Sequence, residues 1–125
     1  VKEKGLESKI SFLGFQNDVI PFLNNSDFFI HLPISPDPLP TVIFEAINTK
    51  TPVITNDLGG AIEILDNGKY GLIIKNDLIE ESVDKILNYI NNKKQQKENI
   101  DNAYRYVHEN FSLKKFKNEI LNTIE

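Results

Sequence analysis

Four short, largely apolar runs along the chain predict β-strands. Glycine, proline, asparagine or aspartate bounds each run, and these residues commonly end regular structure. Because few positions within the runs are polar, we expect both faces of each strand to be covered, as in a parallel sheet. The runs are residues 9–13, 27–32, 52–55 and 71–74.

Helices are expected between these strands, at residues 18–25, 41–48 and about 61–65. An alternation of strand and helix is typical of a parallel sheet whose strands are joined by crossover helices. The first two-thirds of the chain therefore predict a fold of the α/β class.

The last third of the chain predicts three helices, because its apolar residues recur at helical spacing. The first should follow a cap at Asn76 or Asp77 and end near residues 91–92, the second should span about residues 95–109, and the third should follow a cap at Ser112. The apolar positions are Leu78, Ile79, Val83, Ile86, Leu87 and Ile90 in the first helix, Ile100, Ala103, Tyr104 and Val107 in the second, and Leu113, Phe116, Ile120, Leu121 and Ile124 in the third.

Composition narrows the possible functions. With 125 residues, 40% of them hydrophobic and 26% charged, the chain has the makeup of one globular domain. A net charge of −4 without a basic block argues against nucleic-acid binding, which needs clustered Lys and Arg. The chain has no cysteine and two well-separated histidines, so we expect no disulfide and no metal site. No apolar run approaches the roughly 20 residues that span a bilayer, and we expect a cytoplasmic protein.

Candidate chemistry lies in the loops that follow the strands, because ligands of open parallel sheets bind beyond the carboxyl ends of the strands. These loops are residues 14–18, 33–40 and 56–60. The second is unusual, since it holds prolines at positions 33, 36, 38 and 40. Proline restricts its own backbone and that of the preceding residue, so this loop should be stiff and extended.

The end of the proline loop combines two carboxylates with a helix start. The free amides of Thr41, Val42 and Ile43 predict an anion site that the helix dipole assists. Asp37 and Glu45 flank these amides, and a carboxylate can accept hydrogen bonds from two sugar hydroxyls. The alternative stays open that Asp37 is only a helix cap and Glu45 a solvated surface residue.

Other polar residues have simpler interpretations. Gly59 and Gly60 would let the backbone approach a ligand or would form a plain turn. His31 could contact a ligand but is more typical of a hydrogen-bonded core histidine, and His108 is expected to be structural. The lysine pairs at positions 93–94 and 114–115 are expected to be solvated.

An ordered set of segments covers nearly the whole chain and resembles the carboxyl-terminal domain of family-4 glycosyltransferases. Each segment alone is weakly specific, but the set in this order is highly specific. The segments are residues 10–14, 27–33, 36–46 and 51–60, then Glu63 and residues 66–71.

This resemblance implies a retaining enzyme of the GT-B fold, in which two Rossmann-like domains enclose a catalytic cleft. Residues 1–110 would be the Rossmann-like, nucleotide-sugar-binding domain, and residues 111–125 would cross to the acceptor domain. The first strand and helix of the donor domain, with an Arg and a Lys that neutralise the diphosphate, are expected upstream of Val1 together with the acceptor domain. We therefore expect this chain alone to be inactive.

The resemblance also assigns roles to residues. The family's two acids, with seven residues between them, fall on Asp37 beside the transferred sugar and Glu45 on the ribose. Backbone amides around Leu39, Thr41 and Val42 would meet the sugar and diphosphate. The loop of Gly14, Phe15 and Gln16 would border the base, and Gly59 and Gly60 would also belong to the donor-binding site.

Three departures from the family pattern leave the sugar undetermined. Asp37 stands where the general pattern has Glu, which shortens the side chain by about one methylene, although this form resembles a variant among polysaccharide-building members. Leu39 and Pro40 replace a glycine-rich turn, and Ile34 replaces a small hydroxyl residue.

The function predicted from the sequence is transfer of a sugar from a nucleoside diphosphate to a glycan, lipid or polysaccharide precursor, with no metal and no cofactor. Its partners would be a nucleotide sugar, the acceptor and the acceptor domain of the same polypeptide. A peripheral contact with the inner face of the membrane would run only through the part outside this chain. The alternatives are a non-catalytic nucleotide-sugar-binding or regulatory module and, with less support, a flavodoxin-like or receiver-like domain.

Overall fold

The computed structural model describes the backbone of residues 2–124 and the side chains of residues 2–122. A three-stranded sheet lies at its centre, in the order β1-β2-β3, with β1 at Phe29–His31, β2 at Val53–Asn56 and β3 at Leu72–Ile74. Both pairings are parallel, with Phe29 opposite Val53 and Ile54 opposite Leu72. The predicted α/β class with a parallel sheet is confirmed.

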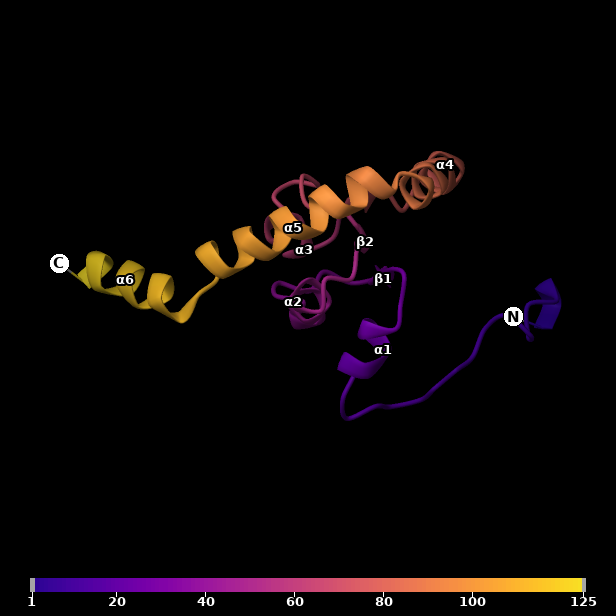
Figure 1. Ribbon diagram of the computed structural model, residues 1–125, viewed down its shortest axis with the longest axis horizontal. Helices are drawn as coiled ribbons and strands as arrows, with labels where there is room; N and C mark the ends of the chain where they lie inside the picture. The colour runs from indigo at the N-terminus through magenta and orange to yellow at the C-terminus, as the bar shows by residue number, and fades with distance from the viewer. Residues whose placement is uncertain (1, 125) are drawn as a thin grey trace.

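Helices connect the strands and then continue beyond the sheet (Figure 1). A short 3₁₀ helix comes first, and the last two helices, α5 and α6, follow one another away from the sheet. The helices are η1 at Lys2–Lys4, α1 at Ile20–Asn24, α2 at Thr41–Asn48, α3 at Ala61–Ile64, α4 at Ile79–Asn91, α5 at Lys93–Asn110 and α6 at Leu113–Ile124.

The main core lies where α1, α2, α3 and α5 pack together against the sheet. Its buried side chains come from segments far apart in the sequence, so packing rather than local helix formation holds these short elements in place. Helix α4 packs against β3 and α5. The core side chains are Leu23, Ile43, Ala46, Ile47, Val53, Ala61, Ile64, Leu65, Ala103 and Val107.

The strand predicted at residues 9–13 is wrong. This segment, which the structure describes in full, has no strand pairing and runs away from the sheet (Figure 1). Phe12 is 82% exposed and Leu13 is 56% exposed. A strand needs a neighbour that accepts and donates its backbone hydrogen bonds, and β1 pairs only with β2 among the described strands.

The apolar positions expected along α4 are only partly packed. Ile79 is 72% exposed, while Ser82 and Tyr89 are buried. The Ser82 hydroxyl donates to the Lys75 carbonyl oxygen over 2.9 Å, and the Tyr89 carbonyl oxygen accepts from Gln96 of α5. Contacts with β3 and α5 thus set the packed face of α4, and Val83 and Leu87 of the apolar stripe remain half exposed.

The helix caps differ in part from the prediction. Neither Asn76 nor Asp77 caps α4, whose N-cap position is Leu78 without a side-chain hydrogen bond. The side chain of Asn92 caps α5, which begins at Lys93, two residues earlier than predicted. The Ser112 cap is confirmed, since its Oγ accepts the Lys115 amide over 3.2 Å. Leu113, Phe116, Ile120 and Leu121 on α6 are exposed, and the side chain of Ile124 lies outside the described residues.

Candidate functional site

The proline loop joins β1 to α2 at the carboxyl end of the sheet. Asp37 lies in its middle and is exposed, and its carboxylate Oδ1 accepts the Leu39 amide over 3.0 Å. Pro40 is fully buried and occupies the N-cap position of α2 in an extended conformation. Asp37 therefore does not cap α2. Its carboxylate closes a small turn within the loop, and the cap-only interpretation fails.

The amides ahead of and inside the first turn of α2 are not equally available. The Ile43 amide donates to the Pro40 carbonyl oxygen over 3.0 Å, so the prediction of a free Ile43 amide is wrong. The Leu39 amide is held by Asp37 in the ligand-free state. Thr41 and Val42 remain as first-turn amides that helix geometry leaves without a partner inside the helix.

Glu45 shares a cavity with the loop that precedes α1. This cavity measures about 450 Å³, and Glu45 lines it from the middle of α2, where its side chain is half-buried. The predicted base loop contributes Phe15 and Gln16, so the structure brings together residues some thirty positions apart that the sequence assigned to one ligand. Asn17, Asp18, Val19 and Ile20 complete the lining.

The base loop is ordered by its own hydrogen bonds. The side-chain Nε2 of Gln16 donates to the Leu13 carbonyl oxygen over 2.8 Å, and the Asp18 carboxylate accepts the Ile20 backbone amide over 2.9 Å. Gly14 has a φ of +66°, a conformation that glycine adopts without strain. Phe15 is 89% exposed, so its ring is open to a planar ligand.

A second cavity of about 570 Å³ lies on another side of α2, where α5 turns into α6. Leu39 and Phe44 line this second cavity, and Glu45 lines the first, so the segment from Asp37 to Glu45 borders both cavities. Its other lining residues are Glu63, Tyr106, Asn110, Phe111, Ser112, Leu113, Lys115, Phe116 and Glu119.

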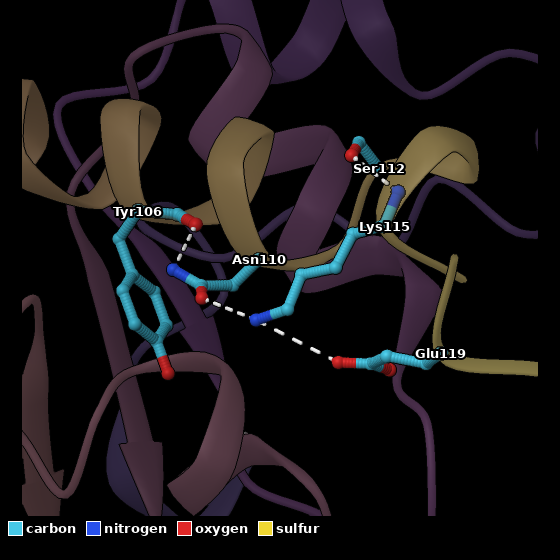
Figure 2. Close-up of polar contacts among 5 residues, drawn as sticks. All are labelled: Tyr106, Asn110, Ser112, Lys115 and Glu119. Atoms are coloured by element: carbon cyan, nitrogen blue, oxygen red, sulfur yellow. Dashed lines mark hydrogen bonds and ion pairs between the residues drawn. The ribbon is translucent and has the colours of Figure 1, made fainter. Parts of the chain in front are cut away.

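Lys115 is held in this second cavity, contrary to the prediction that the lysine pair is solvated. Figure 2 shows its ammonium between Asn110 and Glu119. The Nζ atom donates to Asn110 Oδ1 over 2.7 Å and lies 3.9 Å from Glu119 Oε1. Asn110 in turn donates to the Tyr106 carbonyl oxygen over 2.9 Å within α5, so the bond from Lys115 to Asn110 ties α6 to α5 side chain to side chain.

Tyr106 connects this cavity to the acidic residues of α3. Desolvation raises the pKa of its hydroxyl, and the nearby carboxylates of Asp66 and Glu63 act in the same direction. Tyr106 therefore stays a neutral hydrogen-bonding group at neutral pH.

Two polar groups lie at the ends of β1 and β2, and only Asn56 was not recognised from the sequence. Asn56 is fully buried, and its Nδ2 donates to the Pro33 carbonyl oxygen over 2.8 Å and to Asn76 Oδ1 over 3.1 Å. The only sequence signal for it is a polar residue directly after an apolar run. His31 stacks on Phe29, but its buried Nε2 has no partner among the described residues, so the expected fully hydrogen-bonded histidine is not observed.

Gly59 and Gly60 lie directly against the proline loop. The Gly60 amide donates to the Asp37 carbonyl oxygen over 2.8 Å, and Gly59 has a φ of +68°. The loop is thus held by Asn56 at its start, by Gly60 in its middle and by the burial of Pro40 at its end.

The part of the chain that the structure describes contains no group of three or more His, Asp or Glu side chains placed to hold a metal ion. Within those same residues, no helix is both long enough and apolar enough to cross a bilayer. His108, predicted to be structural, hydrogen-bonds Asn48 through its Nε2, which joins α5 to α2.

The match to known proteins accords with this geometry. Residues 1–106 match the family described as glycosyl transferases group 1. This chain belongs to that family. The expected Rossmann-like arrangement of the GT-B fold is confirmed, and both the donor-binding role and the narrower placement in family 4 stay predictions.

Curated relatives of this chain include a probable sucrose-phosphate synthase of Thermosipho melanesiensis, which is 36% identical over 71% of the chain and 20% of that protein. The uncharacterized glycosyltransferase MJ1607 of Methanocaldococcus jannaschii is 30% identical over 94% of the chain and 30% of its own length. The chain thus spans at most about a third of these proteins.

Solved structures of Anabaena Alr3699/HepE share the fold. The complex of that protein with UDP-glucose matches with a TM-score of 0.83 at 26% identity. The match covers 98% of this chain and 34% of the HepE chain. The complex with UDP alone has a TM-score of 0.84 over the same shares of the two chains.

Proposed function

We propose that this chain is the donor-binding domain of a retaining glycosyltransferase, which transfers a sugar from a nucleoside diphosphate to a glycan, lipid or polysaccharide precursor. One observation carries the proposal. Glu45 and the Phe15–Gln16 loop line one cavity, while Asp37 and the first turn of α2 lie at the other end of the same segment. A nucleotide sugar needs such an ordered series of base, ribose, diphosphate and sugar positions.

Each position in the series suits one part of the donor. Phe15 offers an aromatic face to the base, and the Glu45 carboxylate can accept both ribose hydroxyls. The amides of Thr41 and Val42 at the helix start attract the diphosphate. Asp37 is then left for the sugar, through the carboxylate oxygen that Leu39 does not hold.

The binding of UDP-glucose by HepE supports a nucleotide sugar as the ligand, since the two chains share a fold at 26% identity. In the proposed reaction, the sugar C1–O bond to the diphosphate breaks and the acceptor oxygen bonds to C1 on the same face. The acceptor hydroxyl proton passes to the released diphosphate. The acceptor domain, its cationic groups and a cytoplasmic location are parts of the same proposal.

The decisive experiment uses the full-length protein with UDP-, GDP- and ADP-sugars. Replacing Glu45 by Ala should raise the donor Kd by about 10- to 100-fold, because hydrogen bonds to a charged group contribute about 1.5–3 kcal/mol. Glu80→Ala, at an exposed position in the first turn of α4, is the matched control and should bind the donor normally. Unchanged donor affinity in the Glu45→Ala protein would contradict the proposed site.

A non-catalytic nucleotide-sugar-binding module is the second candidate. It is favoured by one feature, namely that Asp37 is short and already holds the Leu39 amide. This candidate predicts donor binding without release of nucleoside diphosphate in the presence of any acceptor. Turnover by the full-length protein that is lost in Asp37→Ala would exclude it.

A further inference from the structure

Two glycines from the loop after β2 touch the backbone of the loop that carries Asp37. A Cβ atom placed on Gly59 would lie 2.2 Å from the Asp37 carbonyl oxygen and 2.8 Å from its amide nitrogen. A Cβ atom on Gly60 would lie 2.1 Å from the Pro38 carbonyl oxygen. The atoms in the way belong to the main chain, so a side chain at either glycine requires the loop itself to move.

A hydrogen bond fixes the distance between the two loops. The Gly60 amide donates to the Asp37 carbonyl oxygen over 2.8 Å, which joins positions more than twenty residues apart. Gly59 supplies the positive φ of +68° that turns the Gly60 amide toward the loop. Asp37 is thus both packed against the glycines and bonded to one of them.

The position of the Asp37 backbone determines that of its carboxylate. Oδ1 is tied back to the Leu39 amide over 3.0 Å, which restricts rotation of the side chain. Prolines 36 and 38 on either side limit the backbone torsions of the loop. Any displacement at Gly59 or Gly60 is therefore passed on to the Asp37 carboxylate.

We propose that Gly59 and Gly60 are positioning residues, whose missing side chains allow the loop after β2 to hold the Asp37 carboxylate in place for the donor sugar. This inference rests on the proposed function, in which Asp37 contacts the sugar. It differs from the expected role of the two glycines as ligand-binding backbone, because they act here through Asp37.

The test compares Gly60→Ala and Gly59→Ala with Gly68→Ala in the full-length protein. Gly68 is the matched control for Gly59, because it also has a positive φ, of +88°, but an added Cβ at Gly68 would meet only ordinary contacts at 3.7 Å or more. We expect kcat to fall about 100-fold in the Gly60 variant with the donor KM within about threefold, since displacements of about 1 Å can cost that much. The Gly68 variant should keep the wild-type kcat.

A double-variant comparison separates positioning from a general structural role. In an Asp37→Ala background, Gly60→Ala should cause no additional loss of kcat, because the group through which it acts is gone. An equal loss in both backgrounds would overturn the proposal. So would a Gly60→Ala protein with wild-type kcat.

Hydrogen exchange gives a measurement that does not depend on activity. Prolines have no amide hydrogen, so a peptide covering residues 34–40 reports only Ile34, Ser35, Asp37 and Leu39. Its exchange should become about tenfold faster in Gly60→Ala and stay unchanged in Gly68→Ala. If the wild-type protein turns over no nucleotide sugar, the proposed function fails. The hydrogen-exchange result then still decides whether the glycines position Asp37.

The wild-type protein provides the remaining measurement should the glycine variants not fold. The Gly60 amide should exchange slowly, since it donates to the Asp37 carbonyl oxygen. Exchange of the Gly60 amide at the rate of an unstructured glycine would overturn the proposal.

Discussion

The side chain of Asn56, at the end of β2, donates a 2.8 Å hydrogen bond to the carbonyl oxygen of Pro33, just after β1. This bond connects the carboxyl ends of two neighbouring strands and fixes the point where the proline loop leaves the sheet. The Asn56 Nδ2 also reaches Asn76 after β3, so one side chain ties together the segments that follow all three strands.

Replacing Asn56 by Ala should destabilise the protein by about 1–3 kcal/mol, because it leaves the part-buried Pro33 carbonyl oxygen without this hydrogen bond. Asn25→Ala is the control, since Asn25 makes the same type of bond to the Pro21 carbonyl oxygen at an exposed position. The control should stay within about 0.5 kcal/mol of wild type in urea unfolding. Equal midpoints for the two variants would show that the buried bond contributes no more than the exposed one.

Replacing Phe15 by Ala should weaken donor binding by about 5- to 100-fold without lowering stability. Stacking of a base on an aromatic ring contributes about 1–3 kcal/mol, and Phe15 is too exposed to support the core. Phe12, which is 82% exposed and lies outside the cavity lining, is the matched position. Isothermal titration with UDP, GDP and ADP should show the loss for Phe15→Ala only; a similar loss for Phe12→Ala would argue against base stacking on Phe15.

Replacing Ser112 by Ala should loosen the first turn of α6. The Ser112 hydroxyl accepts the Lys115 amide, and loss of such a cap costs about 1 kcal/mol. Hydrogen exchange of the Lys115 amide should therefore become roughly five times faster. Ser26→Ala is the control because the Ser26 hydroxyl donates to a carbonyl oxygen within its own turn, and it should leave α6 unchanged.

Tyr89 should make the protein less stable at alkaline pH. Desolvation raises the pKa of its hydroxyl above the ordinary value near 10, against a smaller opposing effect from the Asn99 side chain. A raised pKa in the folded state means that the folded form favours the neutral phenol. The contribution of Tyr89 to stability is thus complete below pH 10 and is lost as the pH rises through the folded-state pKa.

The matching variant is Tyr89→Phe. It removes the titrating group and a buried hydroxyl that makes no hydrogen bond of good geometry among the described residues, so stability at pH 7 should change by less than about 1 kcal/mol. Unfolding measured from pH 8 to 11 should show a smaller alkaline loss than wild type. An unaltered pH profile would exclude Tyr89 as its source.

Local signals in the sequence predict several elements well. The helix predicted at residues 41–48 coincides with α2 at Thr41–Asn48, because the proline before it both stops the loop and suits a helix start. Two of the three strands fall within predicted runs and β2 ends one residue beyond its run, since each run is apolar and bounded by residues that end a strand. The grouping of Glu45 with Phe15 and Gln16 came from the family resemblance, and the shared cavity is consistent with it.

The errors arise where an element depends on a neighbour. Residues 9–13 have the pattern of a strand, but they find no pairing partner among the described residues. The apolar stripe of α4 is only partly packed, because the polar bonds of Ser82 and Gln96 orient the helix. Lys115 was predicted to be solvated, but the packing of α6 beside the end of α5 places its ammonium between Asn110 and Glu119.

The sequence by itself determined the α/β order, the stiff proline loop and the spacing of Asp37 and Glu45, because each depends on residues close together in the chain. Only the tertiary structure decided that the Asp37 carboxylate accepts the Leu39 amide and that Gly59 and Gly60 contact the backbone of the loop that carries Asp37. The physical reason is that the contact with the glycines joins two loops more than twenty residues apart, and their distance is set by the parallel pairing of β1 with β2.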